Sequence, residues 1–170
     1  MVDIYRVGSD FKIVSGGQTG ADVAGLDWAI ENSIAHGGWC PKGRRTEDGP
    51  LPLRYALTET PVAGYLQRTE WNVRDSDATI VFTLNDNLDG GSKRTADFAD
   101  KLGKPFFHMR PGVHPKYLAR FLVRHQVKVL NIAGKRESSA PDISVFVSET
   151  LSQAIMQVQA ERALPSNTPT

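Results

Sequence analysis

The sequence is poor in cysteine, because Cys40 is the only one among its 170 residues. One cysteine excludes a disulfide within the chain and a metal site built from cysteines alone. We expect Cys40 to be a small buried apolar side chain; its position after a predicted strand leaves contact with a metal or a thiol-bearing cofactor as the alternative. No two histidines have the spacing of metal ligands, so we predict no metal bound directly by the protein.

Two further features are missing. The chain has no apolar run near the roughly 20 residues that cross a bilayer, and its start lacks the apolar stretch of a signal peptide. It also lacks an excess of charge of one sign, with 20 Lys and Arg residues against 19 Asp and Glu. A broad nucleic-acid surface would need a marked basic excess. We therefore expect a cytoplasmic protein that binds neither a membrane nor a nucleic acid.

What the sequence does contain is an alternation of short β-branched runs with segments of helical periodicity. Strands are expected at 12–15, 34–39, 78–82, 105–108 and 127–132, and helices at 21–32, 65–74, 93–102, 114–124 and from 139–142 to about 161. This alternation predicts an α/β fold, a doubly wound Rossmann-like parallel sheet with helices on both faces. Residues 1–163 are expected to form a single domain, and 164–170 a disordered tail.

The first predicted strand ends in a glycine-rich turn, Gly16-Gly17-Gln18-Thr19-Gly20. Glycine permits positive φ and a close approach of the backbone to a phosphate, and free N–H groups at a helix start point toward an anion. We therefore predict that all five residues bind a phosphate-bearing small molecule. The alternative is a plain tight turn, with a helix cap formed by Thr19 and Asp22. The turn matches neither the dinucleotide fingerprint nor a Walker loop.

A second junction of glycines with a helix, Gly90-Gly91-Ser92, follows the third predicted strand and leads to Thr95. In an open parallel sheet, ligands bind outside the carboxyl ends of the strands, so this junction and the first glycine turn are expected to lie at one edge. The backbone N–H groups of both junctions would then contact the same ligand. For Ser92 alone, helix capping is the alternative.

Basic residues are concentrated in loops at the same predicted edge. The clusters are Lys42, Arg44 and Arg45, then Lys93 and Arg94, then Lys135 and Arg136. Each cluster alone could be ordinary solvated loop charge. Because all three fall on the binding side of a nearly neutral protein, we interpret them as cations for an anionic ligand.

Several motifs occur together in one known family. They are Gly16-Gly17-Gln18-Thr19-Gly20-Ala21-Asp22, Pro41-Lys42-Gly43-Arg44-Arg45-Thr46-Glu47-Asp48-Gly49, Arg68-Thr69-Glu70-Trp71-Asn72-Val73 with Asp75-Ser76-Asp77-Ala78-Thr79, and Asn131-Ile132-Ala133-Gly134 with Arg136-Glu137-Ser138. From about residue 11 to 157 the chain resembles the molybdenum cofactor carrier family. These proteins are related to the Rossmann-like cytokinin-activating phosphoribohydrolases, once labelled lysine decarboxylases.

The resemblance implies a small homo-oligomer, a dimer or tetramer, that holds molybdenum cofactor and protects it from oxidation. This cofactor is a pterin with a terminal phosphate and a dithiolene-bound metal. Carried over by motif, the phosphate contacts would be Gly16, Gly17, Thr19 and Gly20, with Gly90, Gly91, Ser92 and Thr95 beside them. We add Gln18, Lys42, Arg44, Arg45, Arg68 and Arg136 as further candidate cofactor-binding residues.

The related hydrolases use a P-G-G-x-G-T-x-x-E motif together with an upstream arginine, and the resemblance implies Arg68 as its counterpart here. Here Phe98 stands where the glutamate would be, and Asp97 would point about 100° away around a helix. This difference favours a binding protein without catalytic residues over an enzyme. The alternative is a nucleotide-binding sensor or a phosphoribohydrolase-like enzyme, for which Asp22 and Glu70 are the remaining possible acids.

Overall fold

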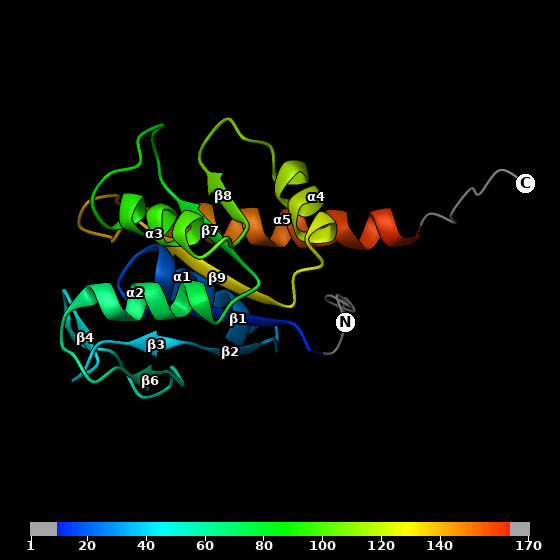
Figure 1. The fold of residues 1–170 in the computed structure, drawn as a ribbon. Helices are drawn as coiled ribbons and strands as arrows, with labels where there is room; N and C mark the ends of the chain where they lie inside the picture. The colour runs from blue at the N-terminus through cyan, green and yellow to red at the C-terminus, as the bar shows by residue number, and fades with distance from the viewer. Residues whose placement is uncertain (1–9, 164–170) are drawn as a thin grey trace, which may run out of the picture.

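The computed structural model describes residues 10–163 (Figure 1). Five parallel strands form the central sheet, in the order β2-β1-β9-β7-β8. They are β1 (Lys12–Ser15), β2 (Ala35–Gly37), β7 (Ala78–Phe82), β8 (Phe106–Met109) and β9 (Val129–Gly134). The predicted α/β, Rossmann-like parallel sheet is confirmed. The tail predicted at 164–170 lies outside the described residues.

Helices cover both faces of this sheet. On one face α1 (Ala21–Glu31), α4 (Pro115–Arg124) and α5 (Ile143–Ala163) pack against one another. On the other face α2 (Tyr65–Arg74) and α3 (Gly90–Lys101) lie side by side (Figure 1). Because both faces are covered, every residue of β7 is buried, as expected for a parallel strand in the middle of a layered domain.

The main core lies between the sheet and the layer of α1, α4 and α5. Ile13, Leu130 and Ile132 of the central strands are fully buried in it. Gly25 of α1 permits a close approach of this helix to the sheet, since a Cβ at this position would lie 2.9 Å from Ile132. The parallel pairing of β1 with β9 places the ends of these two strands beside each other, and α1 packs against both strands.

The structure corrects several predicted boundaries. The strand expected at 34–39 is interrupted at Gly38, whose φ is 120°. After the interruption, β3 (Trp39–Cys40) leaves the sheet and pairs with β6 (Thr58–Glu59). The segment expected to be a loop contains a small antiparallel hairpin of β4 (Arg45–Thr46) and β5 (Gly49–Pro50). Strands β8 and β9 lie one or two residues further along the chain than predicted.

Helix α3 begins three residues earlier than predicted, at Gly90 rather than Lys93. Asp89 is its N-cap residue in an extended conformation, and the carbonyl of Asp89 accepts a hydrogen bond from Lys93 N at 3.1 Å. Ser92 is therefore inside the first turn, and the capping alternative for Ser92 is wrong. This earlier start places both glycines of the second junction in the helix.

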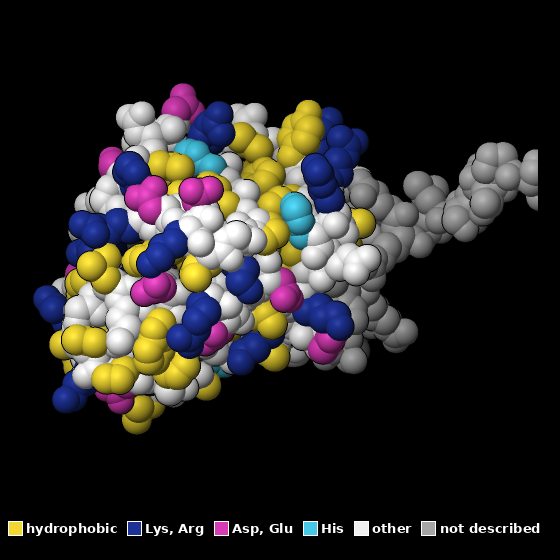
Figure 2. All heavy atoms as spheres, viewed as in Figure 1, with side chains coloured by type: hydrophobic (Ala, Val, Ile, Leu, Met, Phe, Trp, Pro, Cys, Tyr) yellow, Lys and Arg dark blue, Asp and Glu magenta, His cyan; other side chains and the backbone are white. Residues whose placement is uncertain are grey.

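The surface has the mixed charge that the composition predicts. Figure 2 shows Lys and Arg side chains interspersed with Asp and Glu over the face on which α2 and α3 lie. Within residues 10–163, no helix combines the length and the apolar character needed to cross a membrane.

Candidate ligand-binding site

The first glycine turn lies at the carboxyl end of β1, as predicted, but protein atoms already occupy its backbone donors. Gly17 N donates to Ser15 Oγ at 3.3 Å, and Gln18 N donates to Asp22 Oδ2 at 3.2 Å. Thr19 N donates to the side-chain oxygen of Gln18 at 3.0 Å. These donors are therefore satisfied without a ligand, and the carboxylate of Asp22 lies where the sequence analysis expected an anion.

The alternative of a cap formed by Thr19 and Asp22 is also wrong. Gly20 is the N-cap residue of α1, and no side chain caps the helix. The hydroxyl of Thr19 instead donates to Glu47 and accepts a hydrogen bond from Glu137 N at 3.2 Å. Thr19 thus ties the turn to the β4–β5 hairpin and to the loop after β9.

The glycines of this turn are required by packing. A Cβ on Gly16 would lie 1.8 Å from the guanidinium of Arg68, which crosses directly over the backbone here. Gly17 has a φ of 76° and packs against Leu51, and Gly20 has a φ of 78° and packs against the backbone that follows β9. The close approach expected for a ligand is thus made in part by an arginine of the protein itself.

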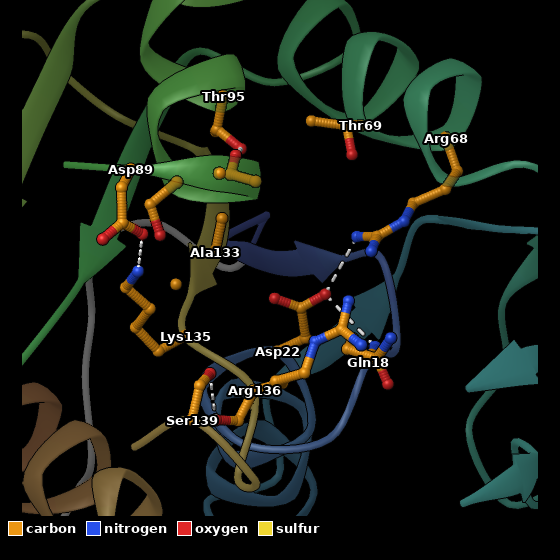
Figure 3. A pocket seen from close by; sticks show the side chains of 14 residues that line it. Gln18, Asp22, Arg68, Thr69, Asp89, Thr95, Ala133, Lys135, Arg136 and Ser139 are labelled. Carbon is orange, nitrogen blue, oxygen red and sulfur yellow. Dashed lines mark hydrogen bonds and ion pairs between the residues drawn. The ribbon is translucent and has the colours of Figure 1, made fainter. Parts of the chain in front are cut away.

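A cavity of about 350 Å³ opens beside this turn, at the carboxyl edge of the sheet (Figure 3). Its walls come from the β1–α1 turn, α2, the start of α3, the end of β9 and the loop after it. The structure brings together here half of the candidate residues that the sequence analysis named: Gln18, Arg68, Gly90, Gly91, Ser92, Thr95 and Arg136. Two junctions far apart in the sequence therefore meet at one cavity.

The remaining candidates do not line this cavity. Lys42 is exposed on a loop. The Arg44 side chain donates to the backbone carbonyls of Leu51, Pro52, Tyr55 and Leu57, at 2.7 to 3.2 Å, so it holds a loop together. Arg45 lies over the ring of Tyr65, with its guanidinium carbon 5.0 Å from the ring centroid. The rest of the first glycine turn is also absent from the lining of this cavity: Gly16, Gly17, Thr19 and Gly20.

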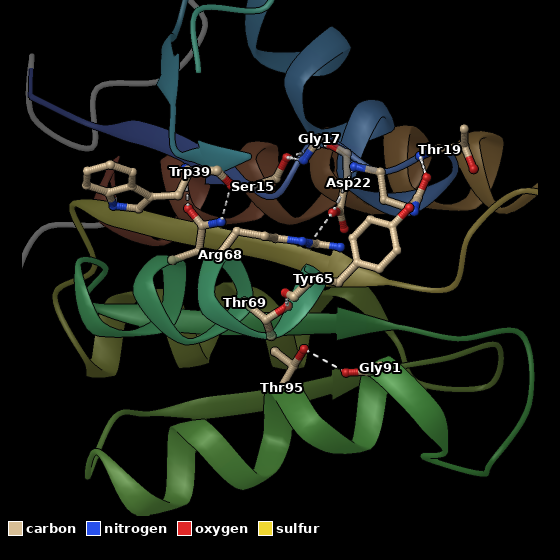
Figure 4. Close-up of polar contacts among 12 residues, drawn as sticks. Ser15, Gly17, Thr19, Asp22, Trp39, Tyr65, Arg68, Thr69, Gly91 and Thr95 are labelled. Carbon is tan, nitrogen blue, oxygen red and sulfur yellow. Dashed lines mark hydrogen bonds and ion pairs between the residues drawn. The ribbon is translucent and has the colours of Figure 1, made fainter. Parts of the chain in front are cut away.

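The most informative residue of the cavity is Asp22, which the sequence analysis weighed mainly as a cap. Its side chain is 4% exposed and forms an ion pair with Arg68 Nη1 at 3.0 Å (Figures 3 and 4). Burial raises the pKa of the Asp22 carboxyl above its usual range, although Arg68 and the Gln18 N–H favour the charged form. A buried acid with a raised pKa in a cavity is a common feature of functional sites.

Further charged groups surround the cavity. Lys135 is paired with Asp89 (Figure 3), and Arg136 lies 3.7 Å from Glu47. The lining therefore carries the three cations Arg68, Lys135 and Arg136 against the two acids Asp22 and Asp89. The excess of positive charge suits an anionic ligand, and the buried Asp22 opposes it.

Unsatisfied polar groups gather at the same place. In residues 10–160, the buried side-chain atoms without a hydrogen-bond partner are Gln18 Nε2, Gln67 Oε1, Arg68 Nε and Ser92 Oγ. Three of these four atoms belong to residues that line the cavity, namely Gln18, Arg68 and Ser92. Leaving a buried polar atom without a partner costs about 1–3 kcal/mol, so a cluster of them requires an explanation.

The start of α3 adds backbone donors to this cluster. The first hydrogen bond of the helix runs from Lys93 N to Asp89 O, so the N–H groups of Gly90, Gly91 and Ser92 precede the helical ladder. Gly90 and Gly91 have no side chain to cover these groups, and the space beside both α-carbons is open. The second junction, rather than the first, has free donors for an anion.

Comparison with known proteins decides the family. Residues 13–155 match the sequence profile of the Circularly permutated YpsA SLOG family. The chain belongs to this family. A crystal structure of a "Putative molybdenum carrier protein" from Syntrophus aciditrophicus is 43% identical, with a TM-score of 0.79 over 82% of this chain and 91% of that chain. The expected relationship to molybdenum carrier proteins is confirmed.

Two other comparisons add little. No curated protein matches the chain. A structure of (E)-4-hydroxy-3-methyl-but-2-enyl diphosphate reductase, the terminal enzyme of the non-mevalonate pathway, is 14% identical and covers 84% of this chain and 59% of that chain. Its TM-score is 0.39.

Cys40, which was singled out in the sequence, lies away from the cavity of this SLOG-family protein. Cys40 is 1% exposed and packs with Leu26 and Leu57 in a small second core, where burial raises the pKa of its thiol. Trp39 and Trp71 pack edge to face against each other, with ring centroids 4.8 Å apart. Among the described residues, no group of three His, Cys, Asp or Glu side chains could hold a metal ion.

Proposed function

We propose that this protein binds molybdenum cofactor as a carrier, with the terminal phosphate of the pterin held at the start of α3. The observation that carries the proposal is the convergence of buried, unpartnered polar atoms of Gln18, Arg68 and Ser92 around one cavity. Free N–H groups of the first turn of α3 border the same cavity. The name of the 43% identical structure supports the choice of ligand.

The residues present fit a phosphate. Ser92 Oγ and the first N–H groups of α3 would donate to its oxygens, and the helix dipole adds about 0.3–1 kcal/mol. The guanidinium groups of Arg68 and Arg136 would add charge-assisted hydrogen bonds, each contributing about 1.5–3 kcal/mol. The bound cofactor would supply the redox-active metal on its dithiolene, while the protein holds the phosphate and limits access of solvent.

The ligand can be identified directly. Native mass spectrometry of protein purified gently from its source, together with elemental analysis for molybdenum, should detect a pterin phosphate with bound metal. A bound nucleotide without molybdenum would contradict the carrier proposal and favour the second candidate function described below.

Replacing Ser92 with alanine tests the phosphate site. We expect inorganic phosphate to bind about tenfold more weakly, as measured by calorimetry, because a donor is lost. In the ligand-free protein the hydroxyl is buried without a partner, so urea unfolding should show unchanged stability or a gain of up to about 1 kcal/mol.

Ser76→Ala is the matched control. Ser76 is also buried, but its hydroxyl donates to Val73 O at 3.0 Å, at the end of α2. This variant should lose about 1 kcal/mol of stability without a change in phosphate affinity. If Ser92→Ala instead behaves like Ser76→Ala, the hydroxyl of Ser92 serves the fold and the proposed phosphate site is wrong.

A second candidate function is hydrolysis of a nucleotide by a phosphoribohydrolase-like reaction. The position of the motif glutamate is Phe98, but Asp22 places a buried acid with a raised pKa beside Arg68 in the cavity. Incubation with nucleoside monophosphates, followed by chromatography of the free bases, tests this function. Release of a base by the wild type and not by Asp22→Asn would support it, and absence of release would exclude it for the nucleotides used.

A further inference from the structure

A second cavity adjoins the proposed phosphate site and has a volume of about 630 Å³. The two cavities share five lining residues: Arg68, Thr69, Gly90, Gly91 and Arg136. The walls that belong to the second cavity alone come mainly from residues 62–67, at and before the start of α2. A ligand held at the start of α3 can therefore extend into this second space, which we name the Tyr65 cavity.

Three arginines surround the aromatic ring of the Tyr65 cavity. The guanidinium carbons of Arg45, Arg68 and Arg136 lie 5.0, 5.4 and 5.8 Å from the centroid of the Tyr65 ring. They come from the β4–β5 hairpin, from α2 and from the loop after β9, so the tertiary fold gathers them. Guanidinium groups stack on flat π-systems and also pair with anions.

The lining of the Tyr65 cavity differs from that of the phosphate site. No Asp or Glu of residues 10–160 lines it, whereas Asp22 and Asp89 line the other cavity. Val62 and Leu66 contribute apolar surface and are 50% and 49% exposed. The lining thus combines apolar walls, an aromatic ring and cations, which suits a flat ring system with negative charge.

A hydrogen-bonding group completes this lining. Gln67 belongs to the wall of the Tyr65 cavity, and its side-chain oxygen is buried without a partner. A nitrogen heterocycle carries N–H donors that such an oxygen accepts, whereas a lipid tail or a plain sugar ring would not combine ring stacking with this contact.

We propose that the Tyr65 cavity binds the ring end of the ligand, a planar nitrogen heterocycle with an anionic substituent. The ring stacks on Tyr65 or on a neighbouring guanidinium, the anionic group pairs with the arginines, and a ring N–H donates to Gln67. This inference rests on the proposed phosphate site, because the shared wall of Arg68, Gly90 and Gly91 connects the two ends of one ligand.

The experiment measures the two ends separately. Pterin-6-carboxylate has the ring and an anionic group but no phosphate, and its binding is followed by its fluorescence; inorganic phosphate is followed by calorimetry. In Tyr65→Leu we expect pterin-6-carboxylate to bind at least tenfold more weakly, and phosphate affinity to stay within about twofold. Arg94→Ala, an exposed change in the wall of the same cavity, should weaken pterin-6-carboxylate several-fold.

Tyr117→Leu is the matched control. Tyr117 is also a partly exposed tyrosine near cations, with Lys116 and Arg120 5.2 and 5.8 Å from its ring centroid, but it lies on α4, across the sheet. It should change neither affinity. Far-UV circular dichroism checks that each variant is folded. If Tyr65→Leu does not fold, the affinity of Arg94→Ala for pterin-6-carboxylate tests the ring site instead.

The outcomes separate the two proposals. If phosphate binds but neither pterin-6-carboxylate nor adenosine binds, or if each binds to Tyr65→Leu and Arg94→Ala as well as to the wild type, the ring site is overturned and the phosphate site stands. If wild-type protein binds no phosphate but binds pterin-6-carboxylate in a Tyr65-dependent manner, the ring site stands and the phosphate site falls. Adenosine in parallel titrations distinguishes a purine from a pterin, and Tyr65-dependent binding of either supports the inference.

Discussion

Replacing Asp22 with asparagine is expected to strengthen the binding of inorganic phosphate by tenfold or more. The carboxylate of Asp22 is buried in the wall of the cavity and forms an ion pair with Arg68 at 3.0 Å, so it competes with a bound anion for the same cation. Two like charges about 5 Å apart repel by about 3 kcal/mol at an effective dielectric constant of about 20. Tenfold corresponds to about 1.4 kcal/mol, which allows for partial relaxation. Asparagine keeps the shape and an oxygen that can accept from Gln18 N.

The same carboxyl should make anion affinity depend on pH. Because burial raises the pKa of Asp22, the acid is neutral at low pH, and affinity should fall as pH rises through this raised pKa. The cations that favour the charged form of Asp22 are Arg68 of α2 and Arg136 of the loop after β9, while Asp89 and Lys135 also line the cavity. Sulfate is the suitable probe, since its charge is constant over this range.

Calorimetric titration with sulfate between about pH 4 and pH 8 checks the prediction. The Asp22→Asn variant should bind more tightly than the wild type at the upper end of this range and lose most of the pH dependence. Weaker binding by the variant at every pH would mean that the carboxyl contributes to the site, and would overturn the assignment of Asp22 as an internal competitor.

Replacing Arg68 with methionine is expected to abolish measurable phosphate binding and to lower the free energy of unfolding by about 3 kcal/mol. Removing one partner of a buried ion pair leaves an uncompensated charge, a change that typically costs about 3–5 kcal/mol. Methionine keeps much of the apolar stem that crosses over Gly16, so the lost charge dominates. We expect a loss at the lower end of this energy range because the raised pKa of Asp22 lets its carboxyl become neutral when Arg68 is absent.

Urea unfolding of a double variant isolates the cause. Asp22→Asn combined with Arg68→Met should recover most of the stability but none of the phosphate binding. With the pKa of Asp22 raised in the folded protein, its contribution to stability is complete below about pH 4 and is lost as pH rises. Arg68→Met alone should therefore be more destabilised at pH 8 than at pH 5.

Arg74→Met, on the same helix, is the control for this pair of variants. Arg74 is 46% exposed and pairs with its neighbour Asp75 at the surface, so its replacement should change stability by less than about 1 kcal/mol. A double variant as unstable as Arg68→Met alone would show that packing of the arginine, and not its charge, supports the fold.

Local patterns were sufficient to predict the five helices and the five strands of the central sheet, but not the small pairings of β3 with β6 and of β4 with β5. The alternation of strands and helices indicates a parallel sheet, and α2 has the predicted bounds, between its N-cap residue Gly64 and its C-cap residue Asp75. The order of the strands was not predictable in the same way, because β9 inserts between β1 and β7 through contacts made far along the chain. Patterning shows that a strand forms, but it does not show which neighbours that strand takes.

The candidate site was predicted in part for a related reason. Both glycine junctions were located, yet a turn sequence does not reveal whether its N–H groups are free. Asp22 and Arg68 are 46 positions apart and meet only in the folded protein. Likewise Arg44 and Arg68 are both arginines in motifs of the family, but the first binds backbone carbonyls of its own loop and the second faces the cavity.

The central position of β9 also has a consequence for biosynthesis. As the ribosome releases the chain from its N-terminus, β1 and β7 emerge well before residues 129–134, and each lacks the partner that later lies between them. Unpaired strand edges attract other chains. A nascent or truncated product that ends before Val129 would therefore consist of two incomplete sheet fragments with exposed edges, and its fate would depend on protection by chaperones until translation is complete.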